Sequence, residues 1–142
     1  MPTSQNAVAP IPTGMKVSLN DADWGKYGQT LLLVLQKDCH FCTESAPFYQ
    51  RLEREMARNS NVRLVAVLPN TVDESKKYLG DLGLSIHEVR QASLSSLGVG
   101  GTPTLILVDG TGKVEASWVG QLPPGKETEV LKRLHVSTVA RD

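Results

Sequence analysis

Continuous apolar runs alternate along the chain with segments in which apolar residues recur every three or four positions. The strongest runs have strand length and occupy residues 30–36, 62–68, 104–108 and 114–119. Strands that are apolar on both faces are typical of a sheet buried between two layers. The link 109–112 (D-G-T-G) is rich in turn residues, so we predict that the last two runs pair as an antiparallel hairpin.

Helical spacing appears between the apolar runs. Phe48, Leu52 and Met56 follow one another at intervals of four, which predicts one amphipathic helix over residues 41–59. Two further helices are predicted, at 72–79 and at 127–134, the second after the break 123–125 (P-P-G). Weaker patterns predict short strands at 15–19 and 85–90 and a helical turn at 92–97 that ends at Gly98.

Strands and helices in this order predict one α/β domain with a mixed central sheet. The chain has 142 residues and is 40% hydrophobic, which suits a single core. We assign the domain to residues 15–142. Residues 1–14 are polar, contain prolines and lack periodicity, so they are expected to form a flexible tail. Such a tail is either the remainder of a trimmed signal or lipid anchor, or an ordinary frayed terminus.

Charge and hydropathy exclude several classes of partner. Fifteen basic and fifteen acidic residues give a formal net charge of zero, so no global field attracts nucleic acid or anionic lipid. The longest apolar stretch, Leu31 to Leu35, is far shorter than the roughly 20 residues that cross a bilayer. We therefore expect a monomer that binds no nucleic acid and is not inserted in a membrane.

The two cysteines carry the clearest chemical signal. Cys39 and Cys42 stand two residues apart in D-C-H-F-C-T, between a buried strand and the first turn of a long helix. Unpaired backbone amides and the helix dipole stabilise a thiolate at that position. Cys39 is the more exposed candidate and Cys42 faces inward, which predicts that Cys39 attacks and Cys42 resolves the mixed disulfide.

The alternative for such a pair is half of a metal site. The remaining ligands would come from His40, His87 and His135, and none of these histidines has a matching spacing. We therefore predict a redox pair that needs no metal and no other cofactor. His87 and His135 are expected to be plain surface or edge residues.

These residues together resemble the thioredoxin superfamily. Beyond the C-x-x-C at a helix start, Pro47 matches the proline of the active-site helix, Gly120 matches the glycine after the last strand, and Pro103 in G-T-P-T matches the cis-proline beside the disulfide. The resemblance implies a thioredoxin-like fold, with a mixed sheet between helices on both faces. It also implies that the Thr102–Pro103 bond is cis.

The segment between Cys42 and Pro103 is longer than in a minimal thioredoxin, with the excess near residues 72–90. This inserted helix and strand is similar to that of TlpA/ResA-like extracytoplasmic oxidoreductases. Leu33 and Glu44 are among the positions that depart from the family pattern. Leu33 stands where thioredoxins have a buried acid, and Glu44 lies two residues after Cys42 where the TlpA group more often has its glutamate at three.

The resemblance implies a thiol/disulfide oxidoreductase that acts on protein substrates and is recycled by a redox-partner protein. His40, Phe41, Thr102 and Pro103 would contact the substrate strand beside the cysteines. A copper-binding module like the Sco proteins is the alternative, although their motif has a three-residue spacer. The tail and the insertion predict a periplasmic or membrane-tethered location, while the ordinary composition leaves the cytoplasm open.

Overall fold

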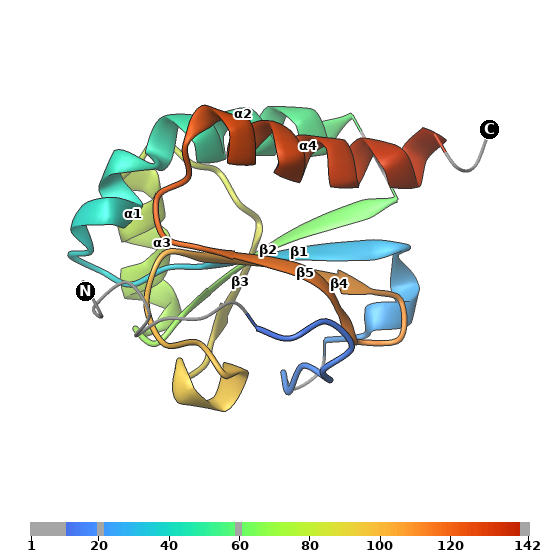
Figure 1. Ribbon diagram of the computed structural model, residues 1–142. Helices are drawn as coiled ribbons and strands as arrows, with labels where there is room; N and C mark the ends of the chain where they lie inside the picture. Colours follow the sequence, from blue (N-terminus) through green and yellow to red (C-terminus); the bar gives the residue numbers. More distant parts are fainter. Residues whose placement is uncertain (1–10, 20–21, 59–60, 140–142) are drawn as a thin grey trace, which may run out of the picture.

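The computed structural model describes residues 11–19, 22–58 and 61–139, the last five of these by their backbone alone (Figure 1). Within these residues five strands form one mixed sheet in the order β3-β2-β1-β4-β5. The first three strands are parallel, and β4 runs antiparallel to both β1 and β5. Their bounds are β1 (Gln29–Val34), β2 (Val62–Leu68), β3 (Glu88–Gln91), β4 (Thr104–Asp109) and β5 (Val114–Val119).

The central strand explains why the apolar runs are continuous. Every residue of β1 is buried, and its side chains alternate between two separate core clusters. Leu31 and Leu33 belong to the cluster on one face of the sheet, and Leu32 and Val34 to the cluster on the other. Both faces are therefore covered, and the predicted sheet and hairpin are confirmed.

The first face is covered by α-helices. Figure 1 shows α2 and α4 lying together across one side of the sheet. Leu52 from α2, Leu79 from α3 and Leu131 from α4 share the core cluster on this face. The four α-helices of the described residues are α1 (His40–Glu44), α2 (Ala46–Ala57), α3 (Val72–Asp81) and α4 (Pro124–Val139).

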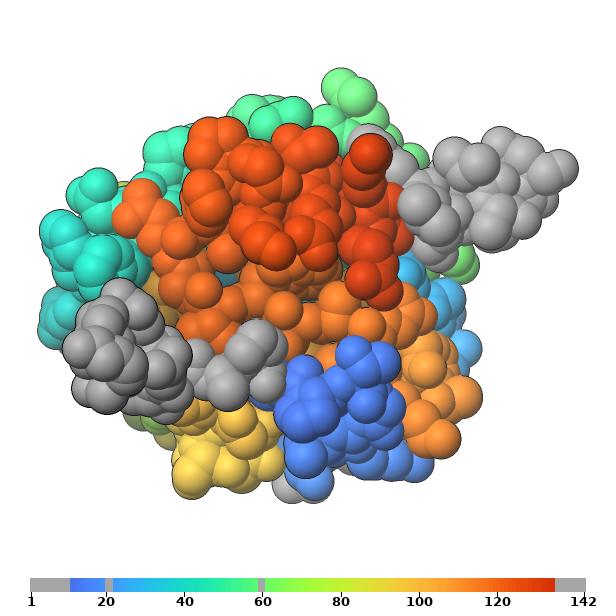
Figure 2. Space-filling view, viewed as in Figure 1, coloured from blue at the N-terminus to red at the C-terminus, as the bar shows by residue number. Residues whose placement is uncertain are grey.

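The second face is covered by irregular chain and two short 3-10 helices, η2 (Trp24–Lys26) and η3 (Ser95–Leu97). Ile11 and Val17 are buried in its core cluster, and the Ile11 N–H donates to the Ser117 hydroxyl at 2.7 Å. Figure 2 shows this first described segment, in blue, beside the orange β4–β5 hairpin. Residues 11–14 of the predicted tail thus pack against the domain, while residues 1–10 lie outside the described part.

Several predicted boundaries are corrected. The strand predicted at 15–19 is only a single bridge between Lys16 and Lys113. The helix predicted at 41–59 is two helices, α1 and α2, separated at Ser45. The last helix begins at Pro124 rather than 127, because proline fits the first turn of a helix, where its missing N–H has no partner to lose.

The inserted unit consists of α3 and β3, and β3 begins at Glu88 rather than 85. A reciprocal capping box starts α3: the Glu74 N–H donates to the Thr71 hydroxyl, and the Thr71 N–H donates to the Glu74 carboxylate. This pair satisfies two amides that the helix itself leaves free. The predicted insertion between the active-site helix and Pro103 is therefore present as a packed part of the domain.

A buried cation joins the inserted strand to the rest of the sheet. Arg63 of β2 is 8% exposed, and its guanidinium donates to the Ala22 carbonyl at 2.5 Å and to the Thr30 hydroxyl at 3.3 Å. It also forms an ion pair with Glu88 at 3.4 Å and lies 5.1 Å from the ring centre of Tyr27. Each nitrogen of the guanidinium group therefore has a hydrogen-bond partner. A charge can be buried without a large loss of free energy only when it has such partners.

Candidate active site

The two cysteines form a disulfide at the end of the sheet where β1 leads into α1. Cys39 is the N-cap residue of α1, the last residue before the first helical turn, and Cys42 lies inside that turn. Their Cα atoms are 5.2 Å apart, which is within the usual range for a disulfide. Cys42 is fully buried, whereas Cys39 is only partly buried.

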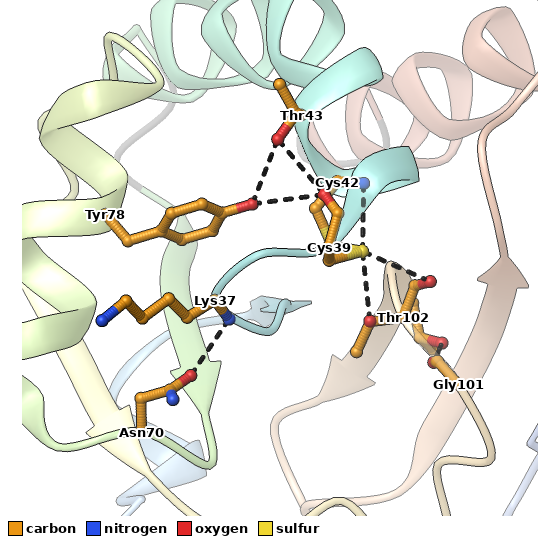
Figure 3. The surroundings of a disulfide bond; sticks show 9 residues. Lys37, Cys39, Cys42, Thr43, Asn70, Tyr78, Gly101 and Thr102 are labelled. Carbon is orange, nitrogen blue, oxygen red and sulfur yellow. Dashed lines mark hydrogen bonds between the residues drawn. A yellow bond between two sulfur atoms is a disulfide. The ribbon is translucent and has the colours of Figure 1, made fainter.

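Two hydrogen-bond donors point at Sγ of Cys39 (Figure 3). The Cys42 N–H donates to this sulfur at 3.1 Å, and the Thr102 hydroxyl donates at 3.3 Å. The Thr102 carbonyl oxygen lies 3.7 Å from the same sulfur. In the reduced protein the two donors would stabilise a Cys39 thiolate, because hydrogen bonds to the charged form favour that form.

The loop that carries Thr102 is held from both sides. The Thr102–Pro103 peptide bond is cis. The Thr104 hydroxyl donates to the Gly101 carbonyl at 2.7 Å, and the Gly120 N–H donates to the Pro103 carbonyl at 2.7 Å. Gly120 has a φ of 84°, a left-handed conformation that glycine adopts without steric cost. The end of β5 therefore holds the loop against the cysteines.

Of the other predicted contact residues, His40 and Phe41 lie at the surface and Pro103 does not. His40 and Phe41 are both exposed, and the Phe41 side chain retains 54% of its accessible surface. Their rings meet edge to face with centres 5.1 Å apart. Pro103 itself is buried, so it shapes the loop rather than presenting its ring to solvent. Glu44 is exposed at the end of α1.

Leu33 and Tyr49 share a core cluster with Cys42, and neither can accept a proton from its thiol. Leu33, at the position of the thioredoxin buried acid, is 1% exposed. Tyr49 belongs to the same core cluster as Cys42 and Leu33, and burial raises its pKa far above the ordinary tyrosine value. Its phenol therefore stays protonated at neutral pH. Neither side chain offers a base for the Cys42 thiol.

Three polar residues near Cys39 were missed by the sequence analysis. The Cys39 carbonyl accepts hydrogen bonds from the Thr43 hydroxyl at 3.2 Å and from the Tyr78 hydroxyl at 3.5 Å. Asn70 accepts the Lys37 N–H through Oδ1 at 3.0 Å. Asn70 and Tyr78 lie far from the cysteines in sequence and belong to no motif, so only the fold brings them here (Figure 3).

Nothing in the described part of the chain supports a metal centre. No group of three or more metal-ligating His, Cys, Asp or Glu side chains occurs among these residues. His87 is exposed and precedes β3, which pairs with β2 from Val65 onward. Val65 also pairs with Leu32 in the middle of β1, so His87 lies level with the middle of the sheet. Cys39 lies beyond the carboxyl end of β1, and the sheet register therefore separates His87 from the cysteines. The side chain of His135 lies outside the described residues.

Comparison with known proteins agrees with this geometry. Residues 22–135 match the family described as a thioredoxin-like domain, so the chain belongs to that family. Similar solved structures include a putative thiol:disulfide interchange protein DsbE from Chlorobium tepidum (TM-score 0.68, 20% identity, covering 89% of this chain and 97% of that one). Another is a thiol-disulfide isomerase from Corynebacterium glutamicum (TM-score 0.63, 20% identity, 92% and 97%).

StoA from Bacillus subtilis is also similar, with a TM-score of 0.58, 15% identity and coverage of 86% and 96%. No curated protein matches the chain significantly in sequence. The family membership and the disulfide at the start of α1 together make this protein a thioredoxin-like oxidoreductase. The predicted membership of the thioredoxin superfamily is thereby confirmed.

Proposed function

We propose that the protein exchanges disulfides with cysteine-bearing protein substrates, with Cys39 as the attacking residue and Cys42 as the resolving residue. The observation that carries this assignment is the asymmetry of the pair. Cys39 is partly exposed and its Sγ accepts hydrogen bonds from the Cys42 N–H and the Thr102 hydroxyl, whereas Cys42 is fully buried. A stabilised, accessible thiolate at Cys39 is a better nucleophile than a buried thiol at Cys42.

The exchange balances as two thiol displacements. The Cys39 thiolate attacks one sulfur of a substrate disulfide, a Cys39–substrate bond forms, and the other substrate sulfur leaves and takes up a proton. Cys42 then loses its proton and attacks Sγ of Cys39, which forms the intramolecular disulfide and releases the second substrate thiol. Counted from the Cys39–Cys42 dithiol, the protein loses two electrons and two protons, and the substrate gains them. The reverse sequence oxidises a substrate dithiol.

We assign the substrate surface to the residues around the Cys39 sulfur. Thr102 presents its carbonyl oxygen and hydroxyl beside Sγ, so an extended substrate segment would pair with its backbone. Phe41 supplies an exposed aromatic face, and His40 lies against it. Pro103 contributes by fixing the backbone direction of the loop. This arrangement favours unfolded or extended protein segments over a small-molecule disulfide.

The cellular setting is a further part of the proposal. We place the protein outside the cytoplasm as a monomer, recycled by a redox-partner protein, because its α3–β3 insertion resembles that of extracytoplasmic TlpA/ResA-like oxidoreductases. In the described residues no helix combines the length and the apolar character that a membrane crossing requires. Fractionation of cells that express the native gene, with alkylation of the cysteines at lysis, would give both the compartment and the redox state.

Trapping of the mixed disulfide tests the roles of the two cysteines. A Cys42→Ala variant should accumulate a covalent complex with a disulfide-bonded protein such as insulin, visible by non-reducing electrophoresis. The matched Cys39→Ala variant should not, because its remaining thiol is buried. A covalent complex formed equally by both variants, or only by Cys39→Ala, would contradict the assignment.

A further inference from the structure

Two attachments hold the backbone that leads into Cys39: one comes from Asn70, between β2 and α3, and the other from Tyr78 of α3. The Lys37 N–H donates to Oδ1 of Asn70 at 3.0 Å, just after β2. The Cys39 carbonyl accepts the Tyr78 hydroxyl of α3 at 3.5 Å, beside the bonds it receives from the Thr43 N–H and hydroxyl. Figure 3 shows Asn70 and Tyr78 reaching this segment from the same side.

The residue between the two attached peptide groups has an unusual conformation. Asp38 has a φ of 63°, in the left-handed region that residues other than glycine adopt rarely. Such a residue keeps this conformation only where its surroundings fix it. The bonds to Lys37 and Cys39 lie immediately before and after Asp38 in the chain, where they oppose its return to an ordinary conformation.

The part that provides the attachments is itself firmly held. The capping box of Thr71 and Glu74 starts α3 directly after Asn70. Ser75 is fully buried and donates through its hydroxyl to the Asn70 carbonyl at 3.4 Å, and Leu79 lies in the main core cluster next to Tyr78 in sequence. Asn70 and α3 can therefore act as a fixed support for the Cys39 segment.

We propose that Asn70 and Tyr78 are positioning residues that hold Cys39 at the N-cap of α1 in the reduced protein. In the oxidised protein the disulfide itself fixes Cys39 in this place. After reduction only noncovalent contacts keep Sγ where the Cys42 N–H and the Thr102 hydroxyl can reach it. The two attachments therefore favour the reactive thiolate over the thiol, and a stabilised thiolate in turn favours the reduced protein over the disulfide. This inference rests on the proposed function of Cys39.

The test measures the reduced form separately from overall stability. Asn70→Ala and Tyr78→Phe each remove one attachment, and Tyr27→Phe is the matched control because Tyr27 contacts Arg63 and not the cysteine segment. Each variant is equilibrated with glutathione, in the reaction in which the protein disulfide and two glutathione thiols give the protein dithiol and glutathione disulfide. The pH midpoint of Cys39 alkylation and the melting temperatures of both redox forms are measured beside it.

We expect Asn70→Ala and Tyr78→Phe each to lower the equilibrium constant for reduction by about threefold, the effect of one modest hydrogen bond. The alkylation midpoint should move to higher pH, and the reduced form should lose more thermal stability than the oxidised form. Tyr27→Phe should leave the midpoint and the constant unchanged. Equal loss of stability in both redox forms, with an unchanged midpoint and constant, would overturn the inference and leave a merely structural role.

Tyr78→Phe deletes a single oxygen, so it keeps the test decisive if Asn70→Ala fails to fold. Different outcomes of this experiment would refute the proposed function and the present inference. If the wild-type cysteines cycle neither with glutathione nor with insulin, the proposed exchange activity is wrong. If they cycle normally and the two variants match the wild type in constant and midpoint, only the role of Asn70 and Tyr78 is wrong.

Discussion

The hydroxyl of Thr102 donates a hydrogen bond to Sγ of Cys39 at 3.3 Å, across 63 positions of sequence. Thr102 thereby connects the loop before β4 to the reactive end of α1. A hydroxyl in this place stabilises a thiolate more than a thiol, because a charged acceptor binds a donor more strongly. The side chain before Pro103 is thus placed to influence the chemistry of Cys39, and we propose that it also contributes to the substrate surface.

Replacing Thr102 by valine tests this relationship. Valine keeps the β-branched shape and removes the donor, so the pH midpoint of Cys39 alkylation should rise by about one unit. Alkylation at neutral pH should slow accordingly. Thr102→Ser retains the hydroxyl and should restore most of the rate. An unchanged midpoint in Thr102→Val would show that the hydroxyl does not act on the sulfur.

A second prediction concerns the buried Arg63. Arg63→Met should lower the free energy of unfolding by about 2 kcal/mol, because the Ala22 carbonyl and the Thr30 hydroxyl lose their partner in the interior. Arg51→Met, on the exposed side of α2, is the matched control and should change stability little. Denaturant titration of both variants gives the comparison, and equal stability of Arg63→Met and wild type would refute the role assigned to this cation.

A third prediction concerns the β4–β5 hairpin. The Thr111 hydroxyl, which donates to Oδ1 of Asp109 at 2.7 Å, is the main cause that lowers the pKa of Asp109, and the amides of Lys113 and Thr111 add to it. Because the pKa of Asp109 is lower in the folded protein than its unfolded value of 3.8, the ionised carboxylate stabilises the fold above that pH. This stabilisation is lost as the pH falls through the pKa of the folded protein.

Asp109→Asn should therefore be less stable than wild type at pH 6, by less than about 1 kcal/mol because the site is exposed. The difference should vanish in acid. Thr111→Val should raise the pKa of Asp109, as followed by NMR titration of its carboxyl carbon. A difference between Asp109→Asn and wild type that persists unchanged down to pH 2 would show that charge plays no part.

The parts of the fold that were predicted from sequence share one property, a strong local pattern. The run 62–68 gives β2 with its observed bounds, because six of its seven residues are apolar and the exception, Arg63, is itself buried. The cysteine pair was found for a similar reason, since the motif and the helix start are local. The apolar positions Phe48, Leu52 and Met56 are buried as the helical spacing predicts.

The parts that were missed depend on contacts between distant segments. The pairing of residues 11–17 with the hairpin involves mostly single hydrogen bonds, which leave no periodic pattern. The break at Ser45 is hidden because apolar positions continue in phase into α2. Asn70 and Tyr78 are ordinary polar residues in the sequence, and only the packing of α3 beside α1 brings them to Cys39.

Alkylation of the reduced protein with iodoacetamide, followed by mass mapping of the peptides, tests the central claim most directly. Cys39 is partly exposed and Cys42 fully buried, so brief treatment under native conditions should label Cys39 alone. Both cysteines should be labelled when the protein is unfolded, which controls for their intrinsic reactivity. Preferential labelling of Cys42 in the native protein would contradict the assignment of Cys39 as the attacking residue.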